Sequence, residues 1–450
     1  MNDNLPISPT LLIILAAFAG LIVLLLLIGK VPLGYNLRNL TVRWKTTAVT
    51  ALAFTLVVFL LTIMLAFVTG MDRLVEESGI PGNVIALSDG ATDEAQSNLS
   101  AEYSIKVLPQ DIKKLVEQDA DGRYLSSREV YAVVNQPIKN APPGGRQRRF
   151  LQVRGLEDPL IAARVHNIEL YPPGKWFPEG GFQKRTRTVN GKKLTETLHE
   201  VVVGEGIARD LGGDDNKDIL EVGDVIEVGP VRGVVVGIMK ASGNTFGSEV
   251  WAQSTWVGER FNKRNSFSSI VSRTRDAATA RRMAEKVKNH KEGAATAMPE
   301  TEYYASLTAT NTLYRIVALV IAAIVAFGGV LGVMNTMFAA ISQRTKDIGV
   351  LRILGYPRRH VLISFLLESL LIGLMGGLIG CVLGYLTNGL SAASTLSAVP
   401  GGGGKSVMLR LVVDANVLAM GMVFTLFMGA LGGLVPALSA MRLRALESMR

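Results

Sequence analysis

The stretch 335–370, NTMFAAISQRTKDIGVLRILGYPRRHVLISFLLESL, decides how this 450-residue chain is built. It starts inside a long apolar run, crosses a short segment rich in basic residues, and enters a second long apolar run at Val361. Both runs exceed the roughly 18 residues that a membrane-spanning helix needs, and only Glu368 interrupts them with a charge. We therefore expect two membrane spans, 316–343 and 361–390, joined by a charged segment, 342–360, outside the bilayer.

Three more apolar runs, 11–29, 46–71 and 415–441, are long enough to cross a membrane. A bilayer core offers backbone groups no partner outside their own helix, so all five runs are predicted to be helical. The first run lacks the features of a cleaved signal peptide, because no Lys or Arg precedes it and no A-x-A site follows it. We interpret it as an extra N-terminal span.

Basic residues predict the orientation of these spans. Three short segments, 30–45, 342–360 and 442–450, hold twelve basic residues and two acidic ones. The positive-inside rule places them in the cytoplasm, as an elbow, a connecting segment and a C-terminal tail. The N-terminus, the polar stretch 72–315 and the loop 391–414 are then outside. Because the whole chain carries +9 and these segments carry +10, the rest sums to about −1, and nucleic acid is excluded as a partner.

The polar stretch 72–315 has the pattern of a mixed α/β domain. Strands are predicted near 83–89, 129–136, 149–156 and 266–274, and helices at 109–118 and 276–290, the second helix opening on Asp276. The middle of the stretch, about 165–258, is rich in short strands and contains Asn190-Gly191, the dipeptide typical of a two-residue hairpin turn. We expect a small β lobe inserted in an α/β domain.

Two glycine-rich stretches resemble nucleotide-binding loops but fail in detail. In VPGGGGKSVML, 399–409, the phosphate-loop pattern needs a glycine where Val399 stands, and no buried strand precedes it. We interpret it as a polar loop between spans. In VVVGEGIARDLGG, 201–213, the dinucleotide fingerprint needs a glycine where Arg209 stands, so a strand-to-helix turn is the better interpretation.

No catalytic or metal-binding pattern is present in the polar stretch. Its histidines, His166, His199 and His290, are scattered, and the acidic run GGDDNKD, 212–218, is an incomplete calcium loop best explained as a solvated turn. The single cysteine, Cys381, lies in a predicted span, so the outer domain folds without disulfides. We expect this domain to bind a partner or to transmit force.

The predicted spans contain small-residue spacing that permits close helix packing. The glycines concerned are Gly328 and Gly332, then Gly376, Gly380 and Gly384, then Gly429 and Gly433. Packing within one chain and dimerisation both stay open, with the first preferred. Glu368 is the one ionisable residue deep inside an apolar run. We expect it to form an ion pair with the charged segment 342–360, and a substrate or proton role is the alternative.

The charged segment interleaves basic and apolar side chains without a single apolar stripe, which argues against a helix lying flat on lipid. A short helix docking in a groove of a partner protein fits this pattern, and so does a basic loop that only follows the positive-inside rule.

This region resembles the signature of the MacB/FtsX-like permeases of type VII ABC transporters. It departs from the pattern at Gln343 and Asp347, where glutamate is usual, and at Ile353, where alanine is usual. The tail VPALSAMRLRALESMR, 435–450, is also similar to the family. The signature is matched at Asn335, Thr336, Arg344, Thr345, Lys346, Ile348, Gly349, Leu351, Arg352, Leu354 and Gly355.

The resemblance implies a fold and a function. The fold is an α-helical polytopic membrane domain, with four core spans plus the extra N-terminal span, and a large extracytoplasmic α/β domain carrying the inserted small β lobe. The chain would be a non-catalytic permease subunit without cofactors, transmitting motion from a separate ABC ATPase to the outer domain for export or extraction of a substrate. The residues implied to contact the ATPase are Arg344, Lys346, Ile348, Gly349, Leu351, Arg352 and Gly355.

The resemblance also implies further partners and a location. These are a second permease copy or a related permease, a membrane-fusion protein or other periplasmic partner, and the lipid of a bacterial inner membrane that the chain crosses several times. One alternative is an FtsX-like regulator that activates extracytoplasmic partners without transport. Another is a membrane-anchored binding module that has no ATPase.

Overall fold

The computed structural model describes residues 7–28, 38, 40–42, 44–141, 147–189, 192–229, 231–241, 243–290, 295–307, 309–396 and 405–442. The chain divides into two compact units. The helical unit comprises the described residues within 1–70, 314–390 and 410–450, and the sheet unit comprises those within 71–313 and 391–409.

Each predicted span contains a helix, but the helix predicted over 361–390 ends at Tyr385 and is followed by a turn over 386–389. The helices are α1 (Pro9–Ile28), α3 (Trp44–Glu76), α10 (Ala309–Gln343), α12 (Arg358–Tyr385) and α13 (Ala415–Arg442), and α11 (Thr345–Ile353) connects α10 to α12. Within the described residues, four helices contain apolar stretches long enough to span a membrane, namely Trp44–Leu74, Leu319–Gln343, Arg358–Tyr385 and Ala415–Met441. The apolar stretch of α1, Pro9–Leu25, is shorter. Most of the predicted elbow, 30–45, lies outside the described residues.

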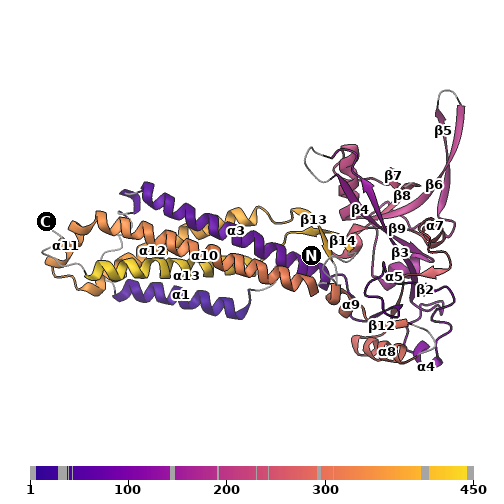
Figure 1. Ribbon diagram of the computed structural model, residues 1–450, viewed down its shortest axis with the longest axis horizontal. Helices are drawn as coiled ribbons and strands as arrows, with labels where there is room; N and C mark the ends of the chain where they lie inside the picture. Colours follow the sequence, from indigo (N-terminus) through magenta and orange to yellow (C-terminus); the bar gives the residue numbers. More distant parts are fainter. Residues whose placement is uncertain are drawn as a thin grey trace. The chain divides into compact units, whose positions relative to one another are not determined.

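The helices of this unit pack through a shared apolar core. Its buried side chains come from α3 (Phe54), α10 (Met337), α11 (Ile348), α12 (Phe365) and α13 (Met428). The added helix α1 packs beside α13 and α12 (Figure 1). At its start, the Ser8 amide donates to Asn416 Oδ1 at 2.7 Å.

The predicted glycine packing occurs within the chain at α12 and α13. An ideal Cβ at Gly376 would lie 2.5 Å from the Ala51 carbonyl oxygen of α3, and Gly380 and Gly384 face the same helix equally closely. Gly429 and Gly433 pack against Ser369 of α12. In contrast, Cβ atoms at Gly328 and Gly332 of α10 would meet no atom of the described residues within 4 Å, so these two glycines bring none of the described helices close.

The sheet unit is built on one ten-stranded sheet in the order β12-β1-β11-β3-β4-β9-β6-β8-β7, with β5 paired to β6. The strands are β1 (Asn83–Ser88), β3 (Ser126–Pro137), β4 (Arg148–Leu156), β5 (Phe182–Val189), β6 (Lys192–Gly204), β7 (Val225–Val228), β8 (Val231–Met239), β9 (Glu249–Gln253), β11 (Ser269–Arg273) and β12 (Ala295–Pro299). Two small sheets pair β2 (Leu99–Ser100) with β10 (Ser266–Phe267), and β13 (Ser391–Leu396) with β14 (Lys405–Arg410). The helices are α4 (Gln110–Lys113), α5 (Pro159–Val165), α6 (Glu205–Gly212), α7 (Ser254–Arg260), α8 (Ala277–Asn289) and α9 (Glu300–Leu307).

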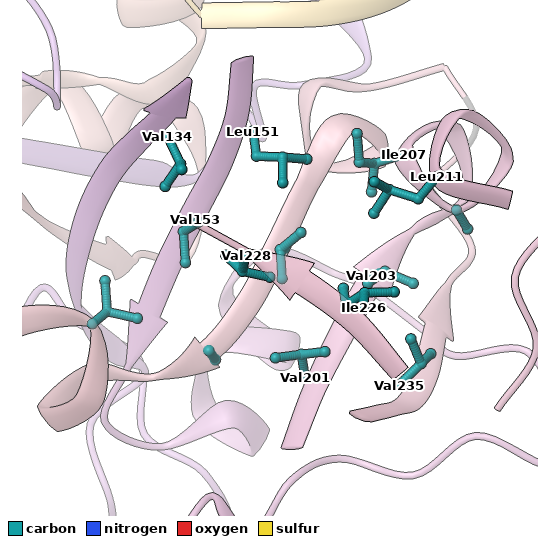
Figure 2. Close-up of a cluster of buried hydrophobic side chains, with 14 of the residues drawn as sticks. Val134, Leu151, Val153, Val201, Val203, Ile207, Leu211, Ile226, Val228 and Val235 are labelled. Atoms are coloured by element: carbon teal, nitrogen blue, oxygen red, sulfur yellow. The ribbon is translucent and has the colours of Figure 1, made fainter. Parts of the chain in front are cut away.

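The strands of the predicted β lobe extend the main sheet. The link is β9, which runs parallel to β4 on one side and antiparallel to β6 on the other. Two apolar cores lie along this sheet. One core joins β3 and β4 to β6 through β9 and to α6 (Figure 2). The other core packs β1, β11 and β12 against α8 and the segment around α4.

Local predictions in this unit hold in most places. The Asp276 carboxylate caps α8 by accepting from the Thr279 amide at 2.7 Å. The predicted hairpin dipeptide, Asn190-Gly191, lies outside the described residues, and the strands on either side of it pair up to Val189 with Lys192. The helix predicted over 109–118 is a single turn, Gln110–Lys113, because Val116 leaves it to bridge Thr274.

The loop predicted at 391–414 contains two paired strands, β13 and β14. Lys405 begins a strand there and not a helix, so the phosphate-loop geometry is absent at this residue. Residues 397–404 lie outside the described residues.

Candidate functional site

The junction between α10 and α11 contains a buried ion pair. Arg344 Nη1 and Nη2 donate to the two carboxylate oxygens of Glu368, each at 2.6 Å, and both side chains are 4% exposed. The Arg344 guanidinium also lies 5.8 Å from the centre of the Phe365 ring. A paired, hydrogen-bonded geometry of this kind is what makes charge burial tolerable in an apolar unit. The ion pair expected for Glu368 is present, and it fixes the start of α11 to α12.

The side chains of α11 divide into a buried and an exposed set. Ile348 is 3% exposed and belongs to the apolar core, and Gly349 is buried beside it. On the other side, Val350 is 48% exposed and Ile353 is 58% exposed. Leu354, which follows the helix, is 69% exposed. Among the described residues, nothing therefore covers these three apolar side chains.

The predicted contact residues fall on both sets. Lys346 and Gly355 are exposed, and Gly355 follows α11 with a φ of +92°, a left-handed value that suits glycine after a helix. Arg344 and Ile348 are directed into the helical unit, because one binds Glu368 and the other fills the core. The side chains of Leu351 and Arg352 lie outside the described residues.

The sheet unit contains a second charged cluster, centred on Arg154 of β4. The guanidinium of Arg154 binds both oxygens of Glu249 at 2.6 and 2.8 Å and an oxygen of Glu94 at 2.6 Å. It also donates to Glu129 of the neighbouring strand β3. All of these side chains are almost completely buried, so the cluster ties β3, β4 and β9 together from within.

His166 continues this cluster towards Glu300, the first residue of α9. Its Nε2 lies 2.7 Å from Glu129 Oε1, and its Nδ1 lies 3.4 Å from Glu300 Oε1. Burial disfavours the charged imidazolium, but the carboxylates of Glu129 and Glu300 outweigh burial and raise the pKa of His166 to about 9. Burial likewise opposes ionisation of Glu129, yet His166 and Arg154 hold its pKa below the usual value. At neutral pH the cluster therefore contains ions of both signs.

Glu300 also accepts hydrogen bonds from the segment that follows α3. Its Oε2 accepts from the Ile80 amide at 3.0 Å and from Asn83 Nδ2 at 2.9 Å. The segment leaving α3 and the segment leading into α10 thus meet at one carboxylate inside the sheet unit.

The structure also tests the candidate catalytic motifs. Among the described residues, no group of three or more His, Cys, Asp or Glu side chains has an arrangement that could hold a metal ion. Gly204, in the stretch with the partial dinucleotide fingerprint, packs so closely that a Cβ would lie 2.4 Å from backbone atoms of Phe246 and Gly247. Close packing therefore explains why glycine occupies position 204. Asp214, in the acidic run, binds Arg149.

Sequence reasoning did not identify the Arg154 cluster. A signal was present, because Glu129, Arg154 and Glu249 each interrupt a strand whose neighbours are mostly apolar. Charges at such positions are rare unless they are paired.

Two protein families match different parts of the chain. Residues 319–445 match the family described as FtsX-like permease C-terminal. Residues 47–290, more than half of the chain, match the MacB-like periplasmic core domain. The chain belongs to the MacB/FtsX-like ABC transporter permeases. The sheet unit of this permease is accordingly its extracytoplasmic domain, and the protein crosses the membrane several times.

Individual relatives share only a modest sequence identity with this permease. An uncharacterised ABC transporter permease of Methanocaldococcus jannaschii is 29% identical over 262 residues, which cover 55% of this permease and 61% of the relative. The macrolide export ATP-binding/permease protein MacB of Burkholderia lata is 26% identical over 400 residues, covering 84% and 50%. This permease therefore spans about half to three fifths of the length of these relatives.

Among solved structures, the periplasmic region of MacB from Actinobacillus actinomycetemcomitans aligns with 53% of this permease and 98% of its own length. The identity is 10% and the TM-score is 0.34, a level that adds nothing to the fold described above.

Proposed function

We propose that this permease transmits ATP-driven motion from a separate ATPase subunit, docked on α11, to its extracytoplasmic domain for export or extraction of a substrate. The observation that carries the proposal is the uncovered apolar surface of Val350, Ile353 and Leu354 next to the buried Arg344–Glu368 pair. Apolar side chains at the centre of a protein interface usually contribute most of its binding energy.

The proposed orientation of the chain starts from the extracytoplasmic position of the sheet unit. One crossing by α10 brings α11 to the cytoplasm, where an ATPase has access to nucleotide. Two further crossings, by α12 and α13, leave the C-terminus in the cytoplasm. If the chain is followed backwards from the sheet unit, α3 crosses to the cytoplasm and α1 crosses back. The proposal therefore has the N-terminus outside, in agreement with the distribution of basic residues.

Transmission across the membrane needs a stiff connection at the docking site. Ile348 anchors α11 in the apolar core that contains residues of α3, α10, α12 and α13. Arg344 anchors the start of the same helix to Glu368 of α12 through two hydrogen bonds. A displacement of α11 would therefore move α10 and α12 with it, because close-packed interiors have little room to deform.

A matching connection exists inside the sheet unit. Ile80 and Asn83, which follow α3, donate hydrogen bonds to Glu300. Glu300 begins α9, the helix just before α10 in sequence. Through His166, Glu300 is linked to the charges that hold β3, β4 and β9. Movement of α3 or α10 would thereby reach the centre of the large sheet.

The proposal is tested by co-purification of the ATPase with permease variants. Ile353→Asp places a charge on the exposed apolar surface and should remove most ATPase binding. Leu386→Asp is the matched control, since this leucine is equally exposed, at 70%, just after the opposite end of α12. Equal recovery of the ATPase with both variants, at normal membrane insertion, would contradict docking on α11.

A further inference from the structure

A two-stranded arm extends from the sheet unit (Figure 1). It consists of β5 and the first half of β6, paired from Phe182 with His199 to Val189 with Lys192. Strand β6 joins β8 only from His199 onward, and β9 only at Val202 and Val203. Among the described strands, β5 pairs with β6 alone, so the arm has an open edge along β5.

The arm is strongly basic. Between Phe182 and Thr197 the sequence has one acidic residue, Glu196, and its five basic residues are Lys184, Arg185, Arg187, Lys192 and Lys193. Glu196 is already bound by Arg232 Nη1 at 2.6 Å. The rest of the stretch 72–310 has a net negative charge, so the positive charge of this domain is concentrated on the arm.

The described side chains at the base of the arm are directed to solvent. Phe182 is 51% exposed, and Lys184 and Arg185 are exposed beside it. Positive charge is thus available along an unpaired strand edge, where backbone N–H and C=O groups can pair with another chain.

We propose that this arm binds an extended acidic polypeptide segment, which adds as a strand to the open β5 edge. A polypeptide is favoured over other polyanions because only another backbone can pair with both the donors and the acceptors of a strand edge. A second copy of the same arm is disfavoured, because five basic residues on each copy would repel one another. The site lies outside the Arg154 cluster and α11, so it does not depend on the proposed coupling mechanism.

Edge protection is the competing explanation, because lysines on exposed edges also prevent unwanted strand pairing. The two explanations differ when the charges are neutralised. If the charges only protect the edge, their removal should cause self-association and leave the affinity for an acidic peptide unchanged. If they select a partner, their removal should weaken binding of that peptide.

The test uses the full chain in lipid nanodiscs and a fluorescent twelve-residue peptide of alternating Glu and Thr as the probe. The arm variant carries Lys184→Gln, Arg185→Gln and Lys193→Gln. Its control carries Lys106→Gln, Lys114→Gln and Lys288→Gln, three exposed lysines elsewhere in the sheet unit. Fluorescence anisotropy should show about tenfold weaker binding to the arm variant, from the loss of three charge contacts, and no change for the control.

The role of backbone pairing is tested with the same peptide N-methylated at alternate residues, and with inorganic polyphosphate of equal charge as a competitor. The N-methylated peptide should bind much more weakly to the wild-type chain, and polyphosphate should displace the parent peptide poorly. Equal affinity of the peptide for wild type and the arm variant would overturn the proposal. Full binding by the N-methylated peptide, or displacement by polyphosphate at equal charge, would overturn strand addition.

Discussion

Arg344 donates one hydrogen bond to each carboxylate oxygen of Glu368, and the pair is closed off from solvent at the point where α10 ends and α11 begins. The two residues are 24 positions apart in the chain, and Arg344 lies in the turn between α10 and α11, whereas Glu368 lies in α12. Their contact makes a short segment of mixed polarity part of the packed helical unit. The same segment keeps three apolar side chains uncovered.

The first prediction concerns this pair. Arg344→Ala leaves the Glu368 carboxylate buried without its partner, and the expected cost is about 3–5 kcal/mol of stability. Exchanging the charges, with Arg344→Glu and Glu368→Arg together, should recover part of that loss. Thermal unfolding in detergent measures both effects, with Arg358→Ala as an exposed control. A melting temperature unchanged by Arg344→Ala would show that the pair does not anchor α11.

Glycine packing in α12 gives a second prediction. Gly376→Val should destabilise the chain by about 1–3 kcal/mol or more, because the new side chain would overlap the Ala51 carbonyl of α3. Gly332→Val is the matched control on α10, where the added Cβ would meet nothing within 4 Å. Thermal unfolding in the same detergent should separate the two variants. Equal tolerance would contradict close contact between α12 and α3.

The pH dependence of the sheet unit gives a third prediction. The pKa of His166 is about 9 in the folded chain and about 6.5 in the unfolded chain. Its stabilising contribution is therefore complete below about pH 6.5 and is lost as pH rises through 9. The gap corresponds to a loss on the order of 3 kcal/mol of unfolding free energy. Unfolding followed by tryptophan fluorescence measures it, since Trp251 lies 5.8 Å from the His166 ring.

His166→Gln is the control for this titration. The variant should be less stable at neutral pH and should lack most of the alkaline loss, because it has no imidazolium to deprotonate. An alkaline loss of the same size in His166→Gln would assign the effect to other groups. Glu129, whose pKa is lowered, acts in the opposite direction, so its contribution is lost as pH falls through the acid range.

Membrane orientation gives a fourth prediction. In a Cys381→Ser background, a cysteine introduced at the exposed Lys106 of the sheet unit should react with an impermeant maleimide in intact cells. A cysteine at Ile353 of α11 should react only after permeabilisation. The reverse pattern would place α11 outside the cell and remove its access to a cytoplasmic ATPase.

The helical unit could be predicted well from the sequence, because each span needs a long uncharged run and few other structures tolerate one. The ends of the spans were less certain. The run predicted over 361–390 gives a helix that stops at Tyr385, followed by a turn at Leu386 that apolar composition alone does not reveal. Glu368 was expected to have a partner in the charged segment, although its identity as Arg344 depends on how α11 folds back on α12.

The charged strand residues of the Arg154 cluster are visible in the sequence, but their pairing could not be predicted, because it depends on long-range sheet order. Arg154 and Glu249 are 95 residues apart and meet only because β9 returns beside β4. Strand β9 also pairs with β6, and so joins the predicted β lobe to the main sheet. Which side chains of α11 are buried could not be predicted either. In a helix of nine residues with mixed polarity, the neighbouring helices decide which side is covered.

The most direct test of docking on α11 is site-specific photo-crosslinking in cells that express the ATPase. A photoreactive amino acid is placed at Leu354, where the side chain is exposed, and separately at Leu386 as a control. Docking on α11 predicts an adduct between the permease and the ATPase from Leu354 and none from Leu386. If neither Leu354 nor the neighbouring exposed positions Val350 and Ile353 gives an adduct in a normally inserted chain, the ATPase does not dock on α11.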